Sequence, residues 1–317
     1  MTSPATYKQV LSLDWLYRWL AIVATAIIAG IGLFMIRMSI DDKLLYQVLE
    51  VVFIPCAIGL IFAVLASRIR SLTFVLSACA DFFCSVSQWL AVAAIGLVLT
   101  YVAASANLPL VDDVFARLDA TMGFRWADTY AWVERHSVLQ TSLRTAYWSG
   151  GMQLLGLFFI HCMRAPGIGS GELMWNFMVS LLITIAISVI LPAAAMPGTI
   201  GQHHIDVFLA VRSGGITVLD APTIAGLVTF PSWHAAMGVI FIYSARNMKW
   251  LLAVLVPLNV LLIAATPPVG GHYLVDTIAG LAVAAVSILL VRRLRRSIAT
   301  QESSNAAARR AAGSAQA

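Results

Sequence analysis

Two polar clusters, FPSWH at residues 230–234 and GGHYLVD at residues 270–276, interrupt an otherwise apolar part of the chain. Each cluster contains one histidine, His234 or His272, and Asp276 follows His272 by four residues. Positions four apart lie on one face of a helix, so the Asp276 carboxylate can reach the His272 ring and fix its tautomer. The apolar segments around the clusters decide the fold, and the clusters are the first sign of chemistry.

The composition is that of an integral membrane protein. Of the 317 residues, 60% are hydrophobic and 11% are charged, whereas a soluble globular protein carries about 25% charged residues. The net charge of +5 does not indicate nucleic-acid binding, because the basic residues flank apolar segments instead of forming one patch with aromatic residues. The four cysteines lack CxxC spacing. We expect no nucleic-acid partner, no metal and no cofactor.

Eight uncharged segments approach the length needed to cross a bilayer, which is roughly 20 mostly apolar residues. They run from Arg18 to Arg37, Glu50 to Arg68, residues 84 to 105, Arg144 to Arg164, Glu172 to near Pro192, His234 to Arg246, Lys249 to near Pro267, and His272 to Arg292. The sequence therefore predicts an all-α, polytopic membrane helix bundle of about eight spans.

The polar segments outside these spans have two different characters. Residues 106–138 mix charged with apolar residues, which is typical of short amphipathic helices at a membrane surface. We expect them to pack over the bundle, and a lid or substrate gate is the alternative. Residues 297–317 have the composition of a disordered tail.

The basic residues predict the orientation in the membrane. With eight spans, both termini lie on one side, and that side carries 13 Lys and Arg residues against 7 on the other. Loops rich in Lys and Arg usually face the cytoplasm. We therefore expect cytoplasmic termini, with His234 and His272 together on the periplasmic or extracellular face.

Two histidines and a carboxylate at the first turns of two helices suit phosphoryl transfer without a metal. His272 would attack phosphorus while Asp276 holds its other nitrogen, and His234 would protonate the departing oxygen. Free backbone N–H groups at the start of the last predicted helix would favour a bound phosphate, and Gly271 would allow it to approach closely.

Both clusters resemble signature motifs, the second and third, of the type 2 phosphatidic acid phosphatase superfamily, and the resemblance extends from about residue 84 to 292. Within that superfamily the chain looks most like the branch of inositol phosphorylceramide synthases and related bacterial proteins. The resemblance implies a six-span catalytic core in residues 71–296, preceded by a two-span addition in residues 1–70. It also implies a phosphohistidine on His272.

The same resemblance implies roles for the neighbouring side chains. Asp276 would orient His272, His234 would protonate the leaving group, and Ser232 would hydrogen-bond a phosphate oxygen. With water as the acceptor the enzyme would be a phosphatase, and with an alcohol it would be a phosphotransferase.

Two departures from the superfamily pattern concern phosphate binding. Its first motif, a lysine followed by Arg-Pro, is absent where residues 191–197 read LPAAAMP, and Thr266 stands where the third motif usually has an arginine. A phosphate at an interface needs charged hydrogen-bond donors. We expect Arg212 to take this role, with further candidates in His203, His204 and Arg144. A metal at the adjacent histidines is a weak alternative without a third ligand.

These observations predict an integral enzyme of a bacterial inner membrane that cleaves or transfers the phosphate of a phospholipid or other lipid phosphate. An alcohol acceptor would be its second partner, and no short motif distinguishes phosphatase from transferase. The alternative is a lipid transporter or scaffold that retains the fold without activity, which the missing basic motif favours.

Overall fold

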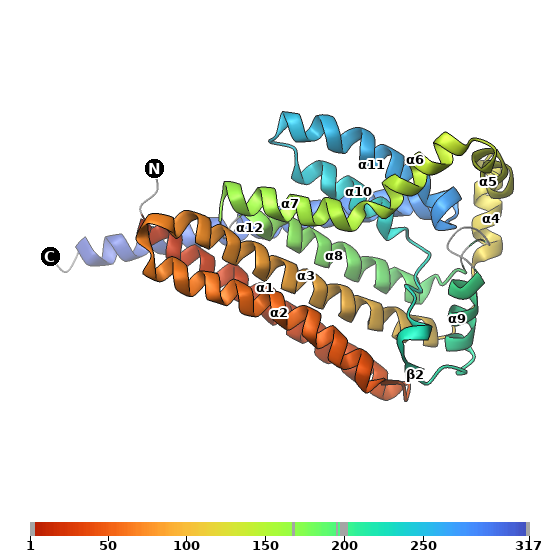
Figure 1. The fold of residues 1–317 in the computed structure, drawn as a ribbon, viewed down its shortest axis with the longest axis horizontal. Helices are drawn as coiled ribbons and strands as arrows, with labels where there is room; N and C mark the ends of the chain where they lie inside the picture. Colours follow the sequence, from red (N-terminus) through yellow and green to blue (C-terminus); the bar gives the residue numbers. More distant parts are fainter. Residues whose placement is uncertain (1–3, 167–168, 195, 197–201, 315–317) are drawn as a thin grey trace.

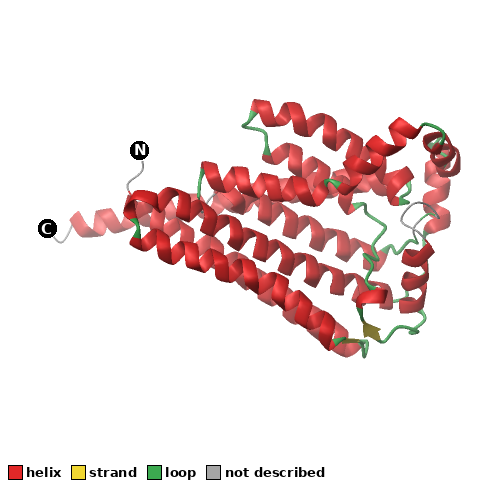
Figure 2. Ribbon diagram, in the orientation of Figure 1, coloured by secondary structure: helices red, strands yellow, loops and turns green. Residues whose placement is uncertain are grey.

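The computed structural model describes residues 4–166, 169–194, 196 and 202–314. Helices form nearly all of the regular structure (Figures 1 and 2), which confirms the prediction of an all-α bundle. Six helices of the described residues are long and apolar enough to cross a membrane, so the chain is an integral membrane protein. They are α1 (Pro4–Met35), α2 (Asp42–Arg68), α3 (Thr73–Ser105), α8 (Gly169–Ile190), α11 (Lys249–Gly270) and α12 (Leu274–Ser314).

Two of the eight predicted spans are not single helices of bilayer-crossing length in the structure. The span expected between Arg144 and Arg164 is divided at Ser149 into α6 (Ser137–Trp148) and α7 (Gly150–Arg164). The span expected from His234 is the 12-residue α10 (Trp233–Ser244). At 1.5 Å per residue, α10 is about 18 Å long, which is less than the roughly 30 Å of a bilayer's hydrocarbon core.

The last helix differs from the sequence expectation at its end. We expected a disordered tail from residue 297, whereas α12 continues to Ser314. Alanine is frequent there and favours helix. Residues 315–317 lie outside the described part of the chain.

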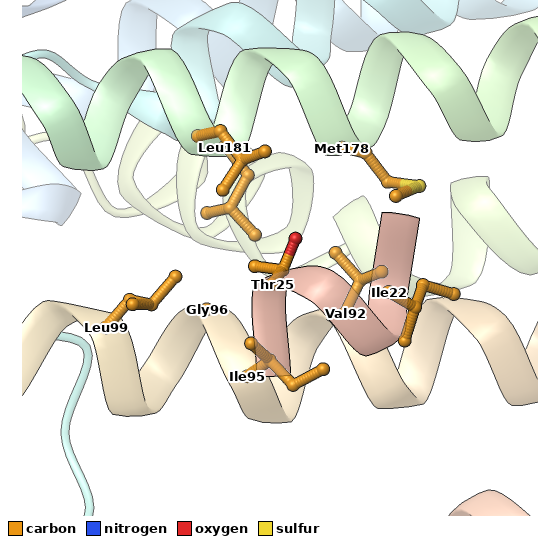
Figure 3. Close-up of a pocket in the computed structure, with 9 residues that line it drawn as sticks. Ile22, Thr25, Val92, Ile95, Gly96, Leu99, Met178 and Leu181 are labelled. Carbon is orange, nitrogen blue, oxygen red and sulfur yellow. The ribbon is translucent and has the colours of Figure 1, made fainter. Parts of the chain in front are cut away.

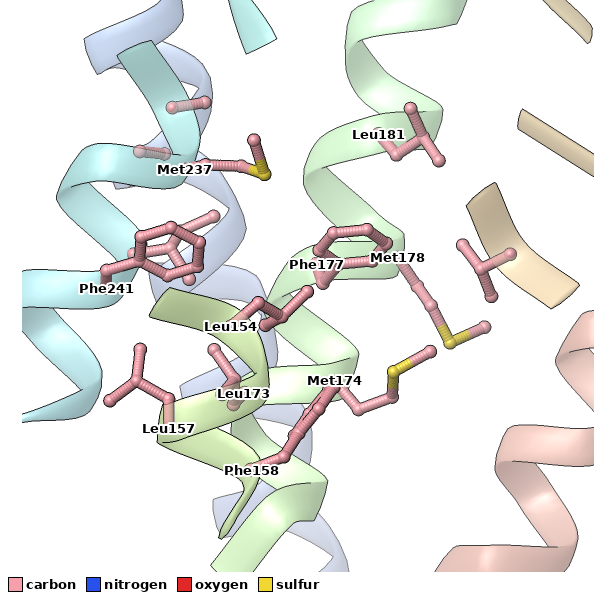
Figure 4. Packing of buried hydrophobic residues seen from close by; sticks show 14 of the residues in the cluster. Leu154, Leu157, Phe158, Leu173, Met174, Phe177, Met178, Leu181, Met237 and Phe241 are labelled. Carbon is pink, nitrogen blue, oxygen red and sulfur yellow. The ribbon is translucent and has the colours of Figure 1, made fainter. Parts of the chain in front are cut away.

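Helix α10 lies at the centre of the bundle, and α1 and α2 lie along its edge. α10 contacts α7, α8, α11 and α12, whereas α2 packs along α3, and α1 packs mainly on α3 (Figure 1). Figure 4 shows apolar side chains of α7, α8 and α10 in the main core, including Leu154, Phe158, Phe177 and Phe241. Burial of these side chains fixes α10 against the helices around it.

Apolar contacts also join α1 to the rest of the bundle. Ile22 of α1, Val92 and Leu99 of α3, and Met178 and Leu181 of α8 surround a cavity of about 10 Å³ (Figure 3). That volume holds about one water molecule at most. The contact between α1 and the bundle is therefore closely packed.

Short elements gather at the end of the bundle away from the first turn of α1 (Figure 1). They are α4 (Asp112–Thr121), α5 (Trp126–Glu134), α9 (Gln202–Arg212), the two-residue parallel strands β1 (Ser39–Ile40) and β2 (Val218–Leu219), and the turn η2 (Ala221–Thr223). A further turn, η1 (Arg70–Leu72), joins α2 to α3. The segment 106–138 thus contains α4, α5 and the start of α6, and α4 packs against α12.

Candidate active site

His272 and Asp276 meet at the junction between α11 and α12. Gly271 ends α11 with a φ of 66°, a left-handed conformation that glycine adopts without strain, and the chain turns there into α12. The His272 Nδ1 atom lies 3.3 Å from the Asp276 Oδ2 atom, so the predicted contact is present, although His272 lies before Leu274, the first residue of α12. The same Oδ2 atom accepts the backbone N–H of Tyr273 at 3.0 Å. The Asp276 side chain is fully buried, so this carboxylate is fixed against the ring.

Burial also affects the protonation of His272. Desolvation lowers the pKa of His272 from about 6.5 to about 4, and a hydrogen bond with the backbone of Thr229 opposes that shift. Desolvation lowers the pKa because it disfavours the charged form. The imidazole of His272 is therefore neutral at pH 7, which is the state that a nucleophile needs.

His234 lies in the first turn of α10 and contacts Tyr147 of α6. The two rings are stacked with their centroids 4.3 Å apart, and the Tyr147 hydroxyl lies 3.2 Å from the His234 Nδ1 atom. Tyr147 is 2% exposed, so its position is set by packing. The Nε2 atom of His234 is not used in this contact.

Gly270 shows that the two histidines belong to one site. A Cβ atom at Gly270 would lie 2.8 Å from the Cδ2 atom of His272 and 2.9 Å from the hydroxyl oxygen of Tyr147. Tyr147 is thus in contact with His234 and lies beside His272. The structure therefore brings together the histidines of both sequence clusters.

Backbone contacts between α10 and α12 hold this arrangement. The N–H of Ser232 donates to the backbone oxygen of Asp276 at 3.0 Å. A Cβ atom at Gly280 would lie 2.2 Å from the backbone oxygen of Ser232, so the two helices approach more closely than any side chain there would allow. Ser232 is fully buried, and its hydroxyl accepts the N–H of Ala235 at 3.4 Å as the N-cap of α10.

The expectation of free N–H groups at the start of α12 is wrong. The Asp119 carboxylate of α4 accepts the N–H of Leu274 at 2.8 Å and the N–H of Val275 at 3.0 Å. A carboxylate is favoured at that end of a helix because the helix dipole is positive there. Asp119 is 4% exposed. The helix terminus that we expected to bind a phosphate is occupied by the protein's own anion.

Asp112 and Phe115 attach the other turns of α4 to the site. Asp112 accepts the Tyr273 hydroxyl at 3.0 Å and the N–H of Ala194 at 3.0 Å. The ring of Phe115 lies between those of Phe230 and Tyr273, with centroids 4.4 Å and 5.9 Å away. Helix α4 therefore covers the junction between the two clusters.

The predicted phosphate-binding histidines differ in their surroundings. His204 of α9 is 8% exposed, and its pKa is lowered to about 4, first by burial and then by the charges of His272 and His203. Its side chain therefore lies near His272. His203 is exposed on the same helix. Residues 197–201, which precede α9, lie outside the described residues.

Neither predicted arginine contacts the histidines. Arg212 donates from Nη2 to the Leu108 backbone oxygen at 2.6 Å, and its guanidinium lies 5.3 Å from the centroid of the Phe208 ring. Its Nη1 atom is buried without a hydrogen-bond partner among the described residues. Arg144 pairs with Glu134 at 3.6 Å. Thr266, at the position of the superfamily's arginine, is buried and contacts the hydroxyl of Thr277.

Two contacts in the site were not predicted from the sequence. Tyr147 precedes His234 by 87 residues, and no spacing in the sequence links the two. Asp119 precedes Val275 by 156 residues. Its position in a charged amphipathic segment was the one signal that it could face the site.

Comparison with known proteins identifies the family. Searches of the curated proteins and of the solved structures found no match. The sequence profile of the PAP2 superfamily matches residues 113–290, from the first turn of α4 to the apolar part of α12. This match includes both histidine clusters and covers more than half of the 317 residues. The chain therefore belongs to the PAP2 superfamily.

Proposed function

We propose that the protein is a membrane enzyme that removes or transfers the phosphate group of a lipid through a phosphohistidine on His272. The contact between the His272 Nδ1 atom and the buried Asp276 carboxylate carries this proposal. With Nδ1 facing the carboxylate, the Nε2 atom is the nitrogen that can attack phosphorus. Membership of a phosphatase-type superfamily supports the same chemistry.

The reaction would proceed in two steps. In the first, a lone pair on His272 Nε2 forms a bond to phosphorus, the bond from phosphorus to the lipid oxygen breaks, and His234 gives that oxygen a proton. In the second, the neutral His234 takes a proton from water or an alcohol as its oxygen attacks phosphorus, and the bond from phosphorus to His272 breaks. His234 thus acts as the general acid in the first step and as the general base in the second.

Tyr147 fits this scheme as a positioning residue. Its hydroxyl lies 3.2 Å from the His234 Nδ1 atom. When His234 is protonated, its Nδ1–H donates to the Tyr147 hydroxyl, and this bond orients the ring so that Nε2–H can protonate the leaving group. Asp276 plays the corresponding part at His272.

Phosphate recognition would rest on groups around the two histidines. We retain Arg212 as the main cation, since its Nη1 atom has no partner among the described residues, and Arg212 lies near Asp112, whose charge affects its pKa. His203 and His204 of α9 and the Ser232 hydroxyl are further donors, whereas the Gly271 N–H already donates to the backbone oxygen of Thr266. Ser232 would have to exchange its bond with Ala235 for one to phosphate.

The membrane setting follows the sequence expectations. We place both termini in the cytoplasm of a bacterial cell and the histidines at the outer face of its inner membrane. The inositol phosphorylceramide synthase-like branch stays our proposal for the subfamily, and a lipid hydroxyl or polyol would then be the acceptor. Residues 71–296 would be the catalytic core, with residues 1–70 as an addition.

The test is an assay of the purified protein in detergent with labelled lipid phosphates, with and without candidate alcohols. Free phosphate alone identifies a phosphatase, and a new phosphorylated product identifies a transferase. Neither product across a broad panel would favour a non-catalytic transporter or scaffold. Arg212→Ala and Arg212→Lys test whether Arg212 binds the phosphate. Unchanged kcat/KM in Arg212→Ala would exclude Arg212 from phosphate binding.

A further inference from the structure

A second polar cavity lies at the end of the bundle opposite the histidines. Its volume is about 280 Å³, and it is lined by the end of α7, the start of α8, the turn after α10, and α12 at Arg295. One water molecule needs roughly 10–15 Å³ by the same measure, so there is room for a small ligand. Along α12, Arg295 is about 34 Å from His272, and the cavity is therefore separate from the proposed active site.

The charges at this cavity are mainly positive. Arg164, Arg246 and Arg295 line it together with one carboxylate, Glu172. Arg246 pairs with Glu172 at 2.7 Å, and the Tyr243 hydroxyl also donates to Glu172, at 2.8 Å. The carboxylate is thus already neutralised within the protein. Arg164 forms no ion pair with the residues that the structure describes.

Arg295 also faces a second carboxylate, that of Asp14 in α1. Both side chains lie close to Gly171, where an added Cβ would be 2.5 Å from Asp14 Oδ2 and 3.3 Å from Arg295 Nη1. Asp14 is bound to Arg18 at 3.3 Å and accepts the indole N–H of Trp175 at 2.9 Å. With Arg18 balancing Asp14, an excess of positive charge remains at the cavity.

Three buried polar atoms of the lining residues have no hydrogen-bond partner in the described structure. They are the His161 Nε2, Asn176 Oδ1 and Arg295 Nη1 atoms. Asn176 is 1% exposed, and its amide nitrogen is held by the backbone oxygen of Glu172 at 2.8 Å. The oxygen of Asn176 is an acceptor, and the guanidinium of Arg295 is a donor. A buried polar atom is unfavourable unless it is paired.

We propose that this cavity binds the phosphate ester of a polyol, as a phospholipid headgroup or as a soluble compound. The arginines would bind the phosphate through charge-assisted hydrogen bonds. A hydroxyl of the polyol would donate to Asn176, the acceptor that a bare anion would leave unpaired. This site is independent of the phosphoryl transfer proposed above.

Binding to the full-length protein in detergent tests the proposal. The probes are glycerol 3-phosphate, dihexanoyl phosphatidylglycerol and, as a zwitterionic control, dihexanoyl phosphatidylcholine. Arg295→Gln and Arg164→Gln should each weaken binding of a phosphate probe about tenfold, as expected for loss of one charge-assisted hydrogen bond. Arg293→Gln removes the same charge from an exposed position of α12 outside the cavity and should change the affinity less than twofold.

The outcomes separate the ligand's source and the two sites. Arginine-dependent binding of glycerol 3-phosphate supports a soluble ester, and such binding of phosphatidylglycerol alone supports a lipid headgroup. Asn176→Ala should weaken the binding of either phosphate probe, and its thermal stability should be checked as a control. If His272→Ala still binds a phosphate probe, the binding belongs to this cavity and not to the proposed active site. This conclusion holds even if phosphoryl transfer is never detected. Equal effects of Arg293→Gln and Arg295→Gln, equal binding of phosphatidylcholine, or no binding of either phosphate probe would overturn the proposal.

Discussion

Tyr147 stacks on His234 with the ring centroids 4.3 Å apart, and its hydroxyl lies 3.2 Å from the histidine Nδ1 atom. The tyrosine comes from α6 and the histidine from α10, so the contact depends on the tertiary fold. It leaves the Nε2 atom of His234 available to a substrate. The orientation of the His234 ring would then depend on the Tyr147 hydroxyl, which contacts the ring through Nδ1.

Tyr147→Phe should therefore lower kcat by about tenfold, the effect of about 1.4 kcal/mol in the barrier, with little change in KM. The stacked ring remains, so the variant should fold normally. The pH dependence of kcat should shift, because the phenylalanine removes the hydroxyl that accepts a hydrogen bond from the protonated ring of His234. Tyr46→Phe, at an exposed position of α2, is the matched control. Wild-type kcat and pH profile in Tyr147→Phe would contradict the positioning role.

Asp119→Asn tests the carboxylate that binds the first N–H groups of α12. We expect the free energy of unfolding to fall by about 1 kcal/mol, because a charged cap is lost at the positive end of a helix. We also expect KM for an anionic lipid phosphate to fall, since a negative charge beside His272 is removed. Asp113→Asn makes the same change on an exposed side chain of α4 and should alter neither quantity. An unchanged melting temperature in Asp119→Asn would argue against the capping role.

Gly280→Ala tests the close approach of α10 and α12. The added methyl group would lie 2.2 Å from the backbone oxygen of Ser232 and 3.0 Å from the Ala235 Cβ atom. Backbone atoms must then move, which should destabilise the protein by about 1–3 kcal/mol and reduce activity by displacing His234. Gly156→Ala in α7 meets nothing within 4 Å and should be neutral or slightly stabilising. Thermal unfolding in detergent compares the two, and equal stability would show that this contact is not tight.

Stability should also depend on pH between 4 and 6.5. Burial lowers the pKa of His272 and of His204 to about 4 in the folded protein, whereas an unfolded chain protonates histidine near pH 6.5. The unfolded state thus binds more protons in this window, and stability falls as the pH is lowered through it. Each histidine contributes a slope of at most about 1.4 kcal/mol per pH unit. His204→Gln should reduce the slope, and an unchanged slope would show that His204 titrates normally.

The local part of the site could be predicted from the sequence, because His272 and Asp276 are only four residues apart, although His272 precedes α12 instead of lying in its first turn. A spacing of four residues is enough to place Asp276 against His272, and the length and apolar composition of most spans mark the bundle. The superfamily assignment also followed from residues within the two clusters. These features need no knowledge of what packs around them.

The remaining features depend on distant segments. The sequence showed a helix start after His272 but not that Asp119, from another helix, binds its N–H groups. Likewise, the division between α6 and α7 at Ser149 lies in a segment that reads as one span. Strands of two residues, such as β1 and β2, are too short to leave an alternating pattern.

The most direct test of the account is to trap the phosphorylated enzyme. The protein is mixed with a lipid phosphate labelled in the phosphoryl group, denatured under alkaline conditions within the first turnover, and digested for mass spectrometry. We predict an acid-labile phosphoryl group on His272 in the wild type and in the exposed-position control Tyr46→Phe, and none in His272→Ala. Labelling of a different residue, or full turnover by His272→Ala, would contradict the proposed mechanism.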